Sequence, residues 1–318
     1  MRILFVGTGD IGIPTLEWLR KSRHTLIGVV TQPDKPVGRH QELQLSGIKQ
    51  IAQREGVPIF QPVKIREAEV QKSLRELDPE VLVVIAYGQI LPRSVLDIPS
   101  VACLNLHASL LPLHRGAAPI QAAIEAGDAE SGIAVMYMAE GLDTGDVLLQ
   151  QTLRLGRRET GGSLHDRLAQ AAPPALEEAL ELLEHGVAPR TPQENARATY
   201  AGKLSREDGE ISWSSPIAVD RRVRAMNPWP GAYTWLPVGG GRRKLKVFSV
   251  IQSRNLSEGA VSGTVLQVER RGILVAAGER SVWLTEVQLE GKRRMRVAEF
   301  LRGTSVNVGI FFGGSGLP

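Results

Sequence analysis

The sequence of 318 residues contains a single cysteine and no long apolar run, and both absences narrow what the chain can be. The one cysteine, Cys103, excludes an intrachain disulfide, and its place in an apolar stretch favours core packing over a nucleophile or a thiolate metal site. No run approaches the ~18 uninterrupted apolar residues of a membrane span. The amino terminus passes directly into a strand-like pattern without the layout of a signal peptide, so we expect a cytoplasmic protein without a membrane partner.

The excess positive charge lies in the last third of the chain. Lys and Arg number 17 against 10 Asp and Glu over residues 205–318, whereas residues 1–204 hold 21 and 24. This asymmetry favours an anionic polymer as a partner of the C-terminal part, although an ordinary solvated basic surface would give the same count.

The length of 318 residues is more than one small hydrophobic core organises, so it predicts two domains.

One stretch, residues 101–121, carries the clearest chemical signal. It begins as an apolar strand, and Asn105 and His107 follow two positions apart. Side chains at i and i+2 of a strand point to the same face, so a carboxamide and an imidazole are expected side by side. The amide can stabilise an oxygen that becomes negative, and the ring can move a proton near neutral pH. The alternative is that Asn105 caps a turn and His107 is a half-buried histidine with satisfied hydrogen bonds.

A Gly- and Asp-rich loop at residues 140–146 follows a second apolar strand. A carboxylate on such a loop, Asp143, can hold the ring of His107 and stabilise its protonated form. Ordinary turn chemistry also accounts for Asp143 and Asp146, because Asp and Gly are favoured in turns.

Four segments in this order resemble the folate-dependent formyltransferases: Asn-Leu-His at 105–107, Ser-Leu-Leu-Pro at 109–112, Arg-Gly-Ala-Ala-Pro-Ile at 115–120 and Gly-Leu-Asp-Thr-Gly-Asp at 141–146. The resemblance extends over nearly the whole chain. Asn-Pro-Trp-Pro at 227–230 and the basic C-terminal region are similar to the branch of the family that acts on methionyl-tRNA.

The resemblance implies a reaction and a set of catalytic residues. A formyl group would pass from 10-formyltetrahydrofolate to the α-amino group of methionine on initiator methionyl-tRNA, which serves translation initiation. Asn105, His107 and Asp143 would be catalytic, and no metal would be needed. The partners would be the tRNA and the folate cosubstrate, and we expect a monomer.

The same resemblance assigns two groups of binding residues. The folate-binding residues would be Ala86, Tyr87, Gly88, Ser109, Leu110, Leu111, Pro112 and Leu142. The tRNA-binding residues would be Arg39, in a polar segment at 32–45 that we expect to be an exposed loop, and Arg242, Arg243, Lys244, Lys246, Lys292, Arg293 and Arg294. Lys and Arg side chains on a domain surface suit phosphate contacts.

The fold is expected to be α/β, with a Rossmann-like, mostly parallel sheet followed by an OB-fold-like β-barrel. A strand at 2–7, a helix at 13–21 and a strand at 24–31 give the βαβ opening of a parallel sheet. We place the catalytic domain at 1–188, a linker at 189–206 and the tRNA-binding domain at 207–318. Five short strands at 232–236, 245–252, 263–268, 272–276 and 282–289 suggest the small barrel, a fold that binds nucleic acids.

The helix predicted at residues 163–185 contains two prolines in its middle. Leucine and alanine recur at three- and four-residue steps along it, which indicates core packing. Pro173 and Pro174 interrupt this pattern, so we expect a break or kink there, which can divide the segment into two helices.

Three other functions stay open. A sister formyltransferase acting on a small amine, such as a nucleotide sugar or glycinamide ribonucleotide, would share the catalytic residues. An RNA-binding protein with an inactive α/β domain would share the basic region. A nicotinamide enzyme rests on Gly7, Gly9 and Gly12, which match a GxGxxG turn, with Asp34 downstream. Prolines flank Asp34, so we interpret these glycines as a tight strand-to-helix turn.

Overall fold

The computed structural model describes residues 1–37, 42–257 and 259–313. Its first elements follow from the sequence pattern. Strand β1 (Arg2–Gly7) is buried after its first residue, and helix α1 (Ile13–Lys21) has a proline in its first turn and two basic residues in its last. Proline is tolerated at that position, and cations near the carboxyl end of a helix favour its dipole. Strand β2 (Thr25–Val30) completes the predicted βαβ unit.

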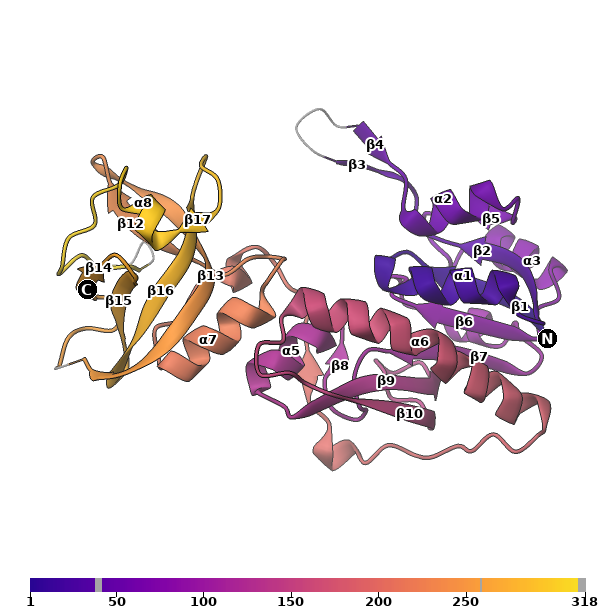
Figure 1. Ribbon diagram of the computed structural model, residues 1–318. Coiled ribbons are helices and arrows are strands. Elements are labelled where there is room, and N and C mark those ends of the chain that lie inside the picture. The colour runs from indigo at the N-terminus through magenta and orange to yellow at the C-terminus, as the bar shows by residue number, and fades with distance from the viewer. Residues whose placement is uncertain (38–41, 258, 314–318) are drawn as a thin grey trace. The chain divides into compact units, whose positions relative to one another are not determined.

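The central sheet has seven strands in the order β10-β9-β7-β6-β1-β2-β5 (Figure 1). The other strands are β5 (Ile59–Phe60), β6 (Val81–Ile85), β7 (Ala102–His107), β9 (Glu130–Tyr137) and β10 (Val147–Arg154). Strands β5, β2, β1, β6 and β7 run parallel, whereas β7 pairs with β9, and β9 with β10, in antiparallel fashion. The expected mostly parallel, Rossmann-like sheet is confirmed.

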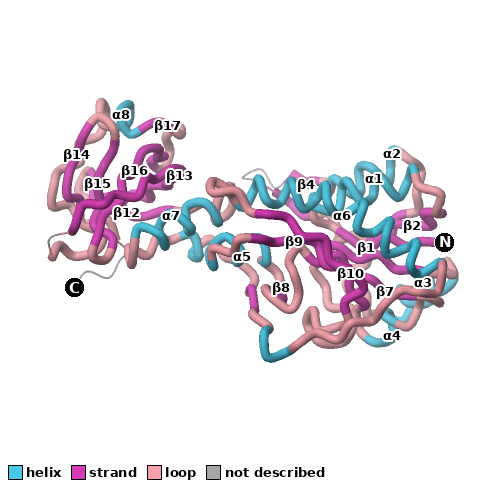
Figure 2. The backbone as a smooth tube through the Cα atoms, turned by 60° about the horizontal axis from the view of Figure 1, so that its bottom comes forward, coloured by secondary structure: helices cyan, strands magenta, loops and turns pink. Residues whose placement is uncertain are grey.

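Helices cover both faces of this sheet (Figures 1 and 2). Helices α1 and α6 (Gly161–Glu184) lie over one face, and α2 (Gly47–Arg54) packs beside α1. Helices α3 (Ala68–Glu76) and α4 (Arg93–Leu96) lie over the other. The core on the α3 and α4 side is continuous and includes Leu4, Val6, Leu74, Leu82, Val84, Val95 and Cys103. A continuous apolar run such as β6 is expected for a parallel strand buried on both faces.

The expected break in the long helix is wrong, because α6 runs without interruption through Pro173 and Pro174. A proline inside a helix costs ~3 kcal/mol relative to alanine. Leu164, Leu168, Leu176 and Leu180 of the same helix are fully buried. Burial of a leucine side chain contributes ~1.5–3 kcal/mol, so the packed stripe holds the helix together across the prolines.

The polar segment at 32–45 was expected to be an exposed loop and is in part a hairpin arm. Strands β3 (Lys35–Val37) and β4 (Glu42–Gln44) pair in antiparallel fashion. Arg39, the predicted tRNA contact of this segment, lies outside the described residues.

The chain divides into two compact units whose boundaries interleave in the sequence. Unit 1 contains residues 1–119, 130–154 and 165–201, and unit 2 contains residues 120–129, 155–164 and 202–318. Residues 189–201 of the predicted linker therefore group with unit 1. There, β11 (Tyr200–Ala201) pairs in parallel with β8 (Arg115–Gly116), and the 3-10 turn η2 (Asn195–Arg197) precedes it. The predicted domain boundaries stay a prediction.

Unit 2 contains the antiparallel sheet β12-β13-β16-β15-β14, with β17 paired to β16. Its strands are β12 (Tyr233–Val238), β13 (Gly241–Leu256), β14 (Val265–Glu269), β15 (Gly272–Ala277), β16 (Arg280–Leu289) and β17 (Met295–Arg296). All five predicted strands are present, and the predicted C-terminal β domain is confirmed as an antiparallel β-sheet domain.

Three helices accompany this sheet in unit 2: most of α5 (Pro119–Ala126), then α7 (Pro216–Ala225) and α8 (Val297–Phe300). The hydroxyl of Ser215 caps α7 by accepting a hydrogen bond from the Ala218 amide at 3.1 Å. Arg222 of α7 forms an ion pair with Glu125 of α5 at 2.7 Å. Two 3-10 turns, η1 (Asp10–Gly12) in unit 1 and η3 (Glu207–Gly209) in unit 2, complete the elements.

The residues just before the end of the described chain pack against β14. The amide of Val265 donates to the carbonyl of Ile310, and that of Phe312 donates to Gly263, both at 2.8 Å. The Phe312 ring is fully buried and lies 6.4 Å from that of Trp213. In this stretch Phe311 forms an isolated antiparallel bridge with Thr264, and Phe312 packs into the core of unit 2.

Because Pro174 is exposed and lies inside α6, we expect Pro174→Ala to raise the free energy of unfolding of the protein by roughly 1–3 kcal/mol. Alanine restores a backbone N–H to the helix and removes no buried contact. Urea unfolding followed by circular dichroism measures the change. Glu177→Ala, at an exposed position of the same helix, is the control and should have little effect; a lower stability of Pro174→Ala would contradict this account.

Candidate active site

Strand β7 presents Asn105 and His107 on the same face of the central sheet. Asn105 pairs with Val84 of β6 on one side and Met136 of β9 on the other, at the place where the sheet changes from parallel to antiparallel pairing. Asn105 is half-buried, and His107 at the end of the strand is 6% exposed. The sequence prediction of a neighbouring amide and imidazole agrees with this register.

The ring of His107 lies between two acceptors. Its Nε2 is 3.0 Å from the carbonyl oxygen of His114, and its Nδ1 is 3.6 Å from Oδ2 of Asp143. Imidazolium donates from both nitrogens, whereas the neutral ring donates from only one. The two acceptors therefore fix the plane of the ring and suit the charge that it carries after taking a proton.

Asp143 connects the other two residues. Its Oδ1 lies 3.5 Å from the Asn105 amide nitrogen, and its Oδ2 accepts a 2.7 Å hydrogen bond from the Gly116 amide. Its backbone is left-handed, with φ of 51°. Such a conformation is uncommon for residues other than glycine and costs of order 1–3 kcal/mol, so the surrounding contacts must hold it. The structure thus brings the three predicted catalytic residues together, while their roles stay a prediction.

Residues 191–201, which we call the strap, hold the backbone around His107 and Asp143. The His114 amide donates to the Thr199 hydroxyl at 2.8 Å, and the Arg115 amide donates to the Thr199 carbonyl at 2.8 Å. Gly116 pairs with Ala201 of the strap. The carbonyl that contacts His107 and the amide that contacts Asp143 therefore belong to a segment that the strap fixes.

The sequence interpretation missed Arg115 and Gln193 of this support. Arg115 is 2% exposed, and its guanidinium donates to the side-chain oxygens of Gln193 and Asn195. Gln193 in turn donates to the carbonyls of Asp143 and Gly145 at 2.9 and 2.7 Å. An arginine in a short Gly- and Ala-rich stretch was the available signal for Arg115. The prolines near Gln193 suggested a linker and concealed its role.

The turn predicted to bind folate, residues 109–112, packs within unit 1. The Ser109 hydroxyl donates to the Leu113 carbonyl at 2.6 Å, and Leu111 joins a small buried cluster with Met136 and Val147. Leu110 and Pro112 are half-buried, whereas Leu142 across the site is 58% exposed. These contacts give the turn a packing role, and its part in folate binding stays a prediction.

The second predicted folate segment, Ala86 to Gly88, follows β6. Ala86 has a left-handed backbone with φ of 46°, and its carbonyl accepts from the amides of Thr8 and Gly9. The carbonyl of Tyr87 accepts from Thr8 and from Gln32. Burial raises the pKa of Tyr87 to about 12, and its hydroxyl is buried without a partner among the described residues. The folate role of these three residues also stays a prediction.

The glycine-rich turn after β1 is built for packing. A Cβ on Gly7 would lie 2.8 Å from the Ile85 carbonyl oxygen, and one on Gly12 would lie 2.9 Å from the Ile85 side chain. The amides of Thr8 and Gly9, which would face a pyrophosphate in a dinucleotide site, already donate to Ala86. This geometry supports the tight-turn interpretation.

Asp34, the other part of the nicotinamide alternative, is also engaged within the protein. Hydrogen bonds from Lys49 and then from Gln61 lower the pKa of its carboxyl group. A carboxylate held in this way is not directed at a ribose hydroxyl. Neither the amides of the glycine turn nor Asp34 is therefore arranged for a nicotinamide dinucleotide.

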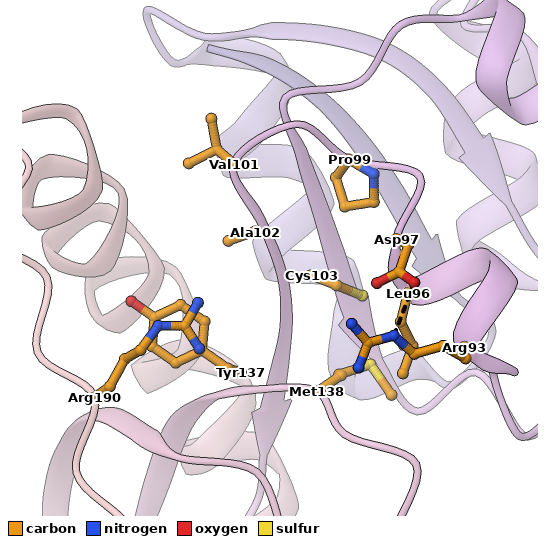
Figure 3. A pocket seen from close by; sticks show the side chains of 10 residues that line it. All are labelled: Arg93, Leu96, Asp97, Pro99, Val101, Ala102, Cys103, Tyr137, Met138 and Arg190. Carbon is orange, nitrogen blue, oxygen red and sulfur yellow. Dashed lines mark hydrogen bonds and ion pairs between the residues drawn. The ribbon is translucent and has the colours of Figure 1, made fainter.

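A pocket of about 320 Å³ opens beside the beginning of β7, where Val101, Ala102 and Cys103 line it (Figure 3). Cys103 points into it from β7, two residues before Asn105 and therefore on the same face. Met138, after β9, lines it too, and Arg190 lies over the ring of Tyr137 at 3.7 Å. Its volume is at the lower end of the range for small-molecule sites.

The predicted tRNA-binding residues of unit 2 form two groups on neighbouring strands. Arg242, Arg243, Lys244 and Lys246 lie on β13, and Lys292, Arg293 and Arg294 lie between β16 and β17. The Glu290 amide donates to the Lys244 carbonyl, and Gln288 donates to the Lys292 carbonyl, so the two groups adjoin.

These cations differ in their contacts. Arg294 forms a two-point ion pair with Glu286 at 2.8–2.9 Å, and Arg293 pairs with Glu299. Lys244 lies over the ring of Tyr233 at 3.8 Å, and Arg242 donates to the Gly313 carbonyl at 3.0 Å. Within the described part of the chain, Arg243, Lys246 and Lys292 have no ion pair, and of these Arg243 and Lys292 are exposed whereas Lys246 is half-buried. Charge is therefore most available at Arg243 and Lys292.

The described residues contain no cluster of three or more His, Cys, Asp or Glu side chains that can hold a metal ion. No helix among them has the length and apolar character that crossing a membrane requires.

Two family models match the chain. The one described as formyl transferase matches residues 1–180, and the one described as formyl transferase, C-terminal domain, matches residues 203–305. The chain belongs to the formyl transferase family. The resemblance noted from the sequence motifs is confirmed.

Curated relatives match over almost their whole length. The methionyl-tRNA formyltransferase of Methylacidiphilum infernorum is 45% identical over 316 residues, which are 98% of both proteins. That of Geotalea daltonii is 45% identical over 315 residues, again 98% of both.

Solved structures share the fold at lower sequence identity. An N-formyltransferase from Helicobacter canadensis, in complex with folinic acid and dTDP-3-aminofucose, gives a TM-score of 0.65 at 13% identity, covering 89% of this chain and 98% of that one. HypX from Aquifex aeolicus, in complex with tetrahydrofolic acid, gives a TM-score of 0.59 at 19% sequence identity. The match covers 98% of this chain and 51% of HypX, so this formyl transferase spans about half of that protein.

We expect Cys103 to resist thiol reagents in the folded protein at pH 8. Burial raises the pKa of the thiol to about 12, so the reactive thiolate is scarce at that pH, whereas a free cysteine has a pKa near ~8.5. With a chromogenic disulfide reagent, the absorbance of the native protein sample should rise at least about 1,000-fold more slowly than that of the protein unfolded in denaturant. One thiol per chain should react in denaturant, and rapid reaction of the native protein would contradict the burial of Cys103.

Proposed function

We propose that this protein transfers a formyl group from 10-formyltetrahydrofolate to the α-amino group of methionyl-initiator-tRNA, giving N-formylmethionyl-tRNA for translation initiation. The observation that carries the proposal is the convergence of Asn105, His107 and Asp143 at the end of β7 in a formyl transferase. An amide donor, a proton carrier and a carboxylate at contact distance are what transfer to an amine requires.

The relatives support the choice of acceptor. Those named methionyl-tRNA formyltransferase match both the Asn105 unit and the C-terminal β domain, over 98% of the chain. The excess of basic residues after residue 204 suits a tRNA more than a small amine. We propose that residues 1–188 form the catalytic domain, 189–206 a linker and 207–318 the tRNA-binding domain. The protein would act as a monomer in the cytoplasm, where translation takes place.

The folate donor would bind on the Asn105 face of the sheet. The pocket that Cys103 and Met138 line begins on this face, and Cys103 lies one strand repeat, about 7 Å, before Asn105. The formyl group of the donor would lie beside the Asn105 amide. Leu142 and the segment 86–88 would border the same space, as the family resemblance implies. The bound donor supplies the formyl group on its N10 nitrogen.

Asn105, His107 and Asp143 would each have a different role in formyl transfer. The amide of Asn105 donates to the formyl oxygen as it gains negative charge during attack by the amine. His107 takes the proton from the attacking nitrogen and passes it to N10 of the donor as the bond between N10 and the formyl carbon breaks, or it stabilises the oxyanion electrostatically while water carries that proton. The His114 carbonyl keeps its ring in place. Asp143 balances the positive charge that His107 then carries. No step requires a metal ion.

A comparison of acceptors tests the proposal. Labelled 10-formyltetrahydrofolate is offered with methionyl initiator tRNA, methionyl elongator tRNA, a nucleotide amino sugar and glycinamide ribonucleotide. Rapid transfer to the initiator species alone is the expected result. Turnover of a small amine without transfer to tRNA would favour a sister formyltransferase, and no turnover of any acceptor would refute the catalytic proposal.

We expect Asn105→Ala to lower kcat by a few hundred-fold, because one oxyanion donor contributes roughly 3–4 kcal/mol to lowering the barrier. The KM values for donor and acceptor should change little, since the hydrogen bond strengthens only in the transition state. Single-turnover formyl transfer measures the chemical step directly. Asn105→Asp keeps the shape but has no donor, and should be equally slow; near wild-type rates in either variant would remove Asn105 from this role.

The surface of unit 2 gives a separate prediction. In the double variant Arg243→Ala with Lys292→Ala, we expect KM for tRNA to rise by about tenfold, with kcat unchanged. The slope of log affinity against log salt concentration should fall by roughly 1.5, because each phosphate contact contributes ~0.7–0.9. Arg294→Ala should change the slope much less, because Glu286 already balances that charge. Equal slopes in all three proteins would place the tRNA elsewhere.

A further inference from the structure

Gln193 makes four hydrogen bonds through one side-chain amide. Its nitrogen donates to the carbonyl oxygens of Asp143 and Gly145, at 2.9 and 2.7 Å. Its oxygen accepts from Nε and Nη2 of Arg115, at 3.0 and 2.8 Å. A primary amide has two N–H donors and two acceptor lone pairs, so the side chain is fully used. It is half-buried, although the strap residues next to it, Pro192 and Glu194, are exposed.

Arg115 decides which way this amide faces. A guanidinium can only donate hydrogen bonds, so the oxygen of Gln193 must turn towards it. The NH2 group of Gln193 must then turn towards the Asp143 loop. Arg115 is 2% exposed, and Asn195 accepts a third bond from it at 2.9 Å, which leaves the guanidinium little freedom. A buried charge that cannot move thus orients the amide.

The two carbonyls that Gln193 holds lie on either side of Thr144, directly after the Asp143 carboxylate. Asp143 itself has a left-handed backbone, which needs support from outside the loop. Without the NH2 group, two carbonyls of the loop would lose a partner, and leaving buried polar groups unpaired is unfavourable. The position of the Asp143 carboxylate relative to His107 therefore depends on Gln193 as well as on the Gly116 amide.

We propose that Gln193, oriented by Arg115, is a positioning residue for formyl transfer, which sets the Asp143 loop at the distance from His107 that the reaction needs. The inference rests on the proposed function, since it concerns the same three catalytic residues. Gln193 touches none of the reacting atoms and acts through Asp143. A misplacement of about 1 Å at such a site can cost on the order of 100-fold in rate.

Gln193→Glu separates positioning from mere folding. The carboxylate still accepts from Arg115, so the buried guanidinium keeps its partner and the protein should stay folded. It has no N–H, so it repels the carbonyls of Asp143 and Gly145. We expect kcat for formyl transfer to fall by about 100-fold, with KM for donor and acceptor changed by less than about threefold. Gln193→Ala should be as slow and also less stable.

Glu194→Gln is the matched control. It exchanges the same two functional groups at the adjacent strap residue, whose side chain is exposed and pairs only with Arg197 among the described residues. We expect wild-type kcat from it. Wild-type kcat in Gln193→Glu would overturn the proposal, and so would an equal loss in Glu194→Gln, because the strap would then act through its charge.

Amide hydrogen exchange provides a readout that needs no turnover. In Gln193→Glu, peptides covering residues 139–146 should exchange at least about tenfold faster than in the wild type, whereas peptides of β1 should not change. Wild-type exchange in that loop would overturn the proposal even if activity fell. If the wild-type protein transferred no formyl group, the proposed function would fail, and the exchange result would still decide whether Gln193 holds the loop.

Discussion

The Asp143 carboxylate is the constraint on which the rest of the candidate active site depends. It lies within reach of Asn105 and His107 and takes a 2.7 Å hydrogen bond from the Gly116 amide. Its own backbone is left-handed, so its position is not one that the loop adopts freely. The Asp143 carboxylate can orient the His107 ring only if other contacts fix its loop. Those contacts come from residues 191–201, a segment distant in the sequence.

The strap shows how this is done. Residues 191–201 follow α6 in the sequence and return to the segment after His107, where β11 pairs with β8 and Thr199 binds the amides of His114 and Arg115. Gln193 reaches the Asp143 loop from the same strap. Three segments that are remote in sequence therefore meet at two side chains that are predicted to be catalytic, His107 and Asp143. Rigidity of this kind favours reactions that depend on placement of the reacting groups.

The comparisons establish the family of the chain, and the geometry shows how its candidate site residues are arranged. Family models match both parts of the chain, and relatives named methionyl-tRNA formyltransferase match nearly all of it. The geometry also argues against a nicotinamide site. The backbone amides of the glycine turn after β1 donate to the Ala86 carbonyl, and Asp34 accepts a hydrogen bond from Lys49. The basic residues of unit 2 likewise divide into paired cations, such as Arg294, and exposed cations without an ion pair among the described residues, such as Arg243.

Much of this protein follows from local pattern. Buried runs such as residues 81–85, the proline at the start of α1 and the alternation along β7 each depend on neighbours within a few residues. The sequence by itself therefore determined most of the longer strands and helices, and the placing of Asn105 and His107 on one face of a strand. The continuity of α6 could not be predicted, because local rules put a break at Pro173 and only tertiary burial of its leucines outweighs that cost. Gln193 and Arg115 could not be found either. Their hydrogen bonds join residues 78 positions apart, and the polar, proline-flanked strap looks like a linker until the fold brings it back to the site. The tertiary structure alone decided which polar residues serve the active site, because hydrogen-bond partners are chosen by distance in space and not by distance along the chain.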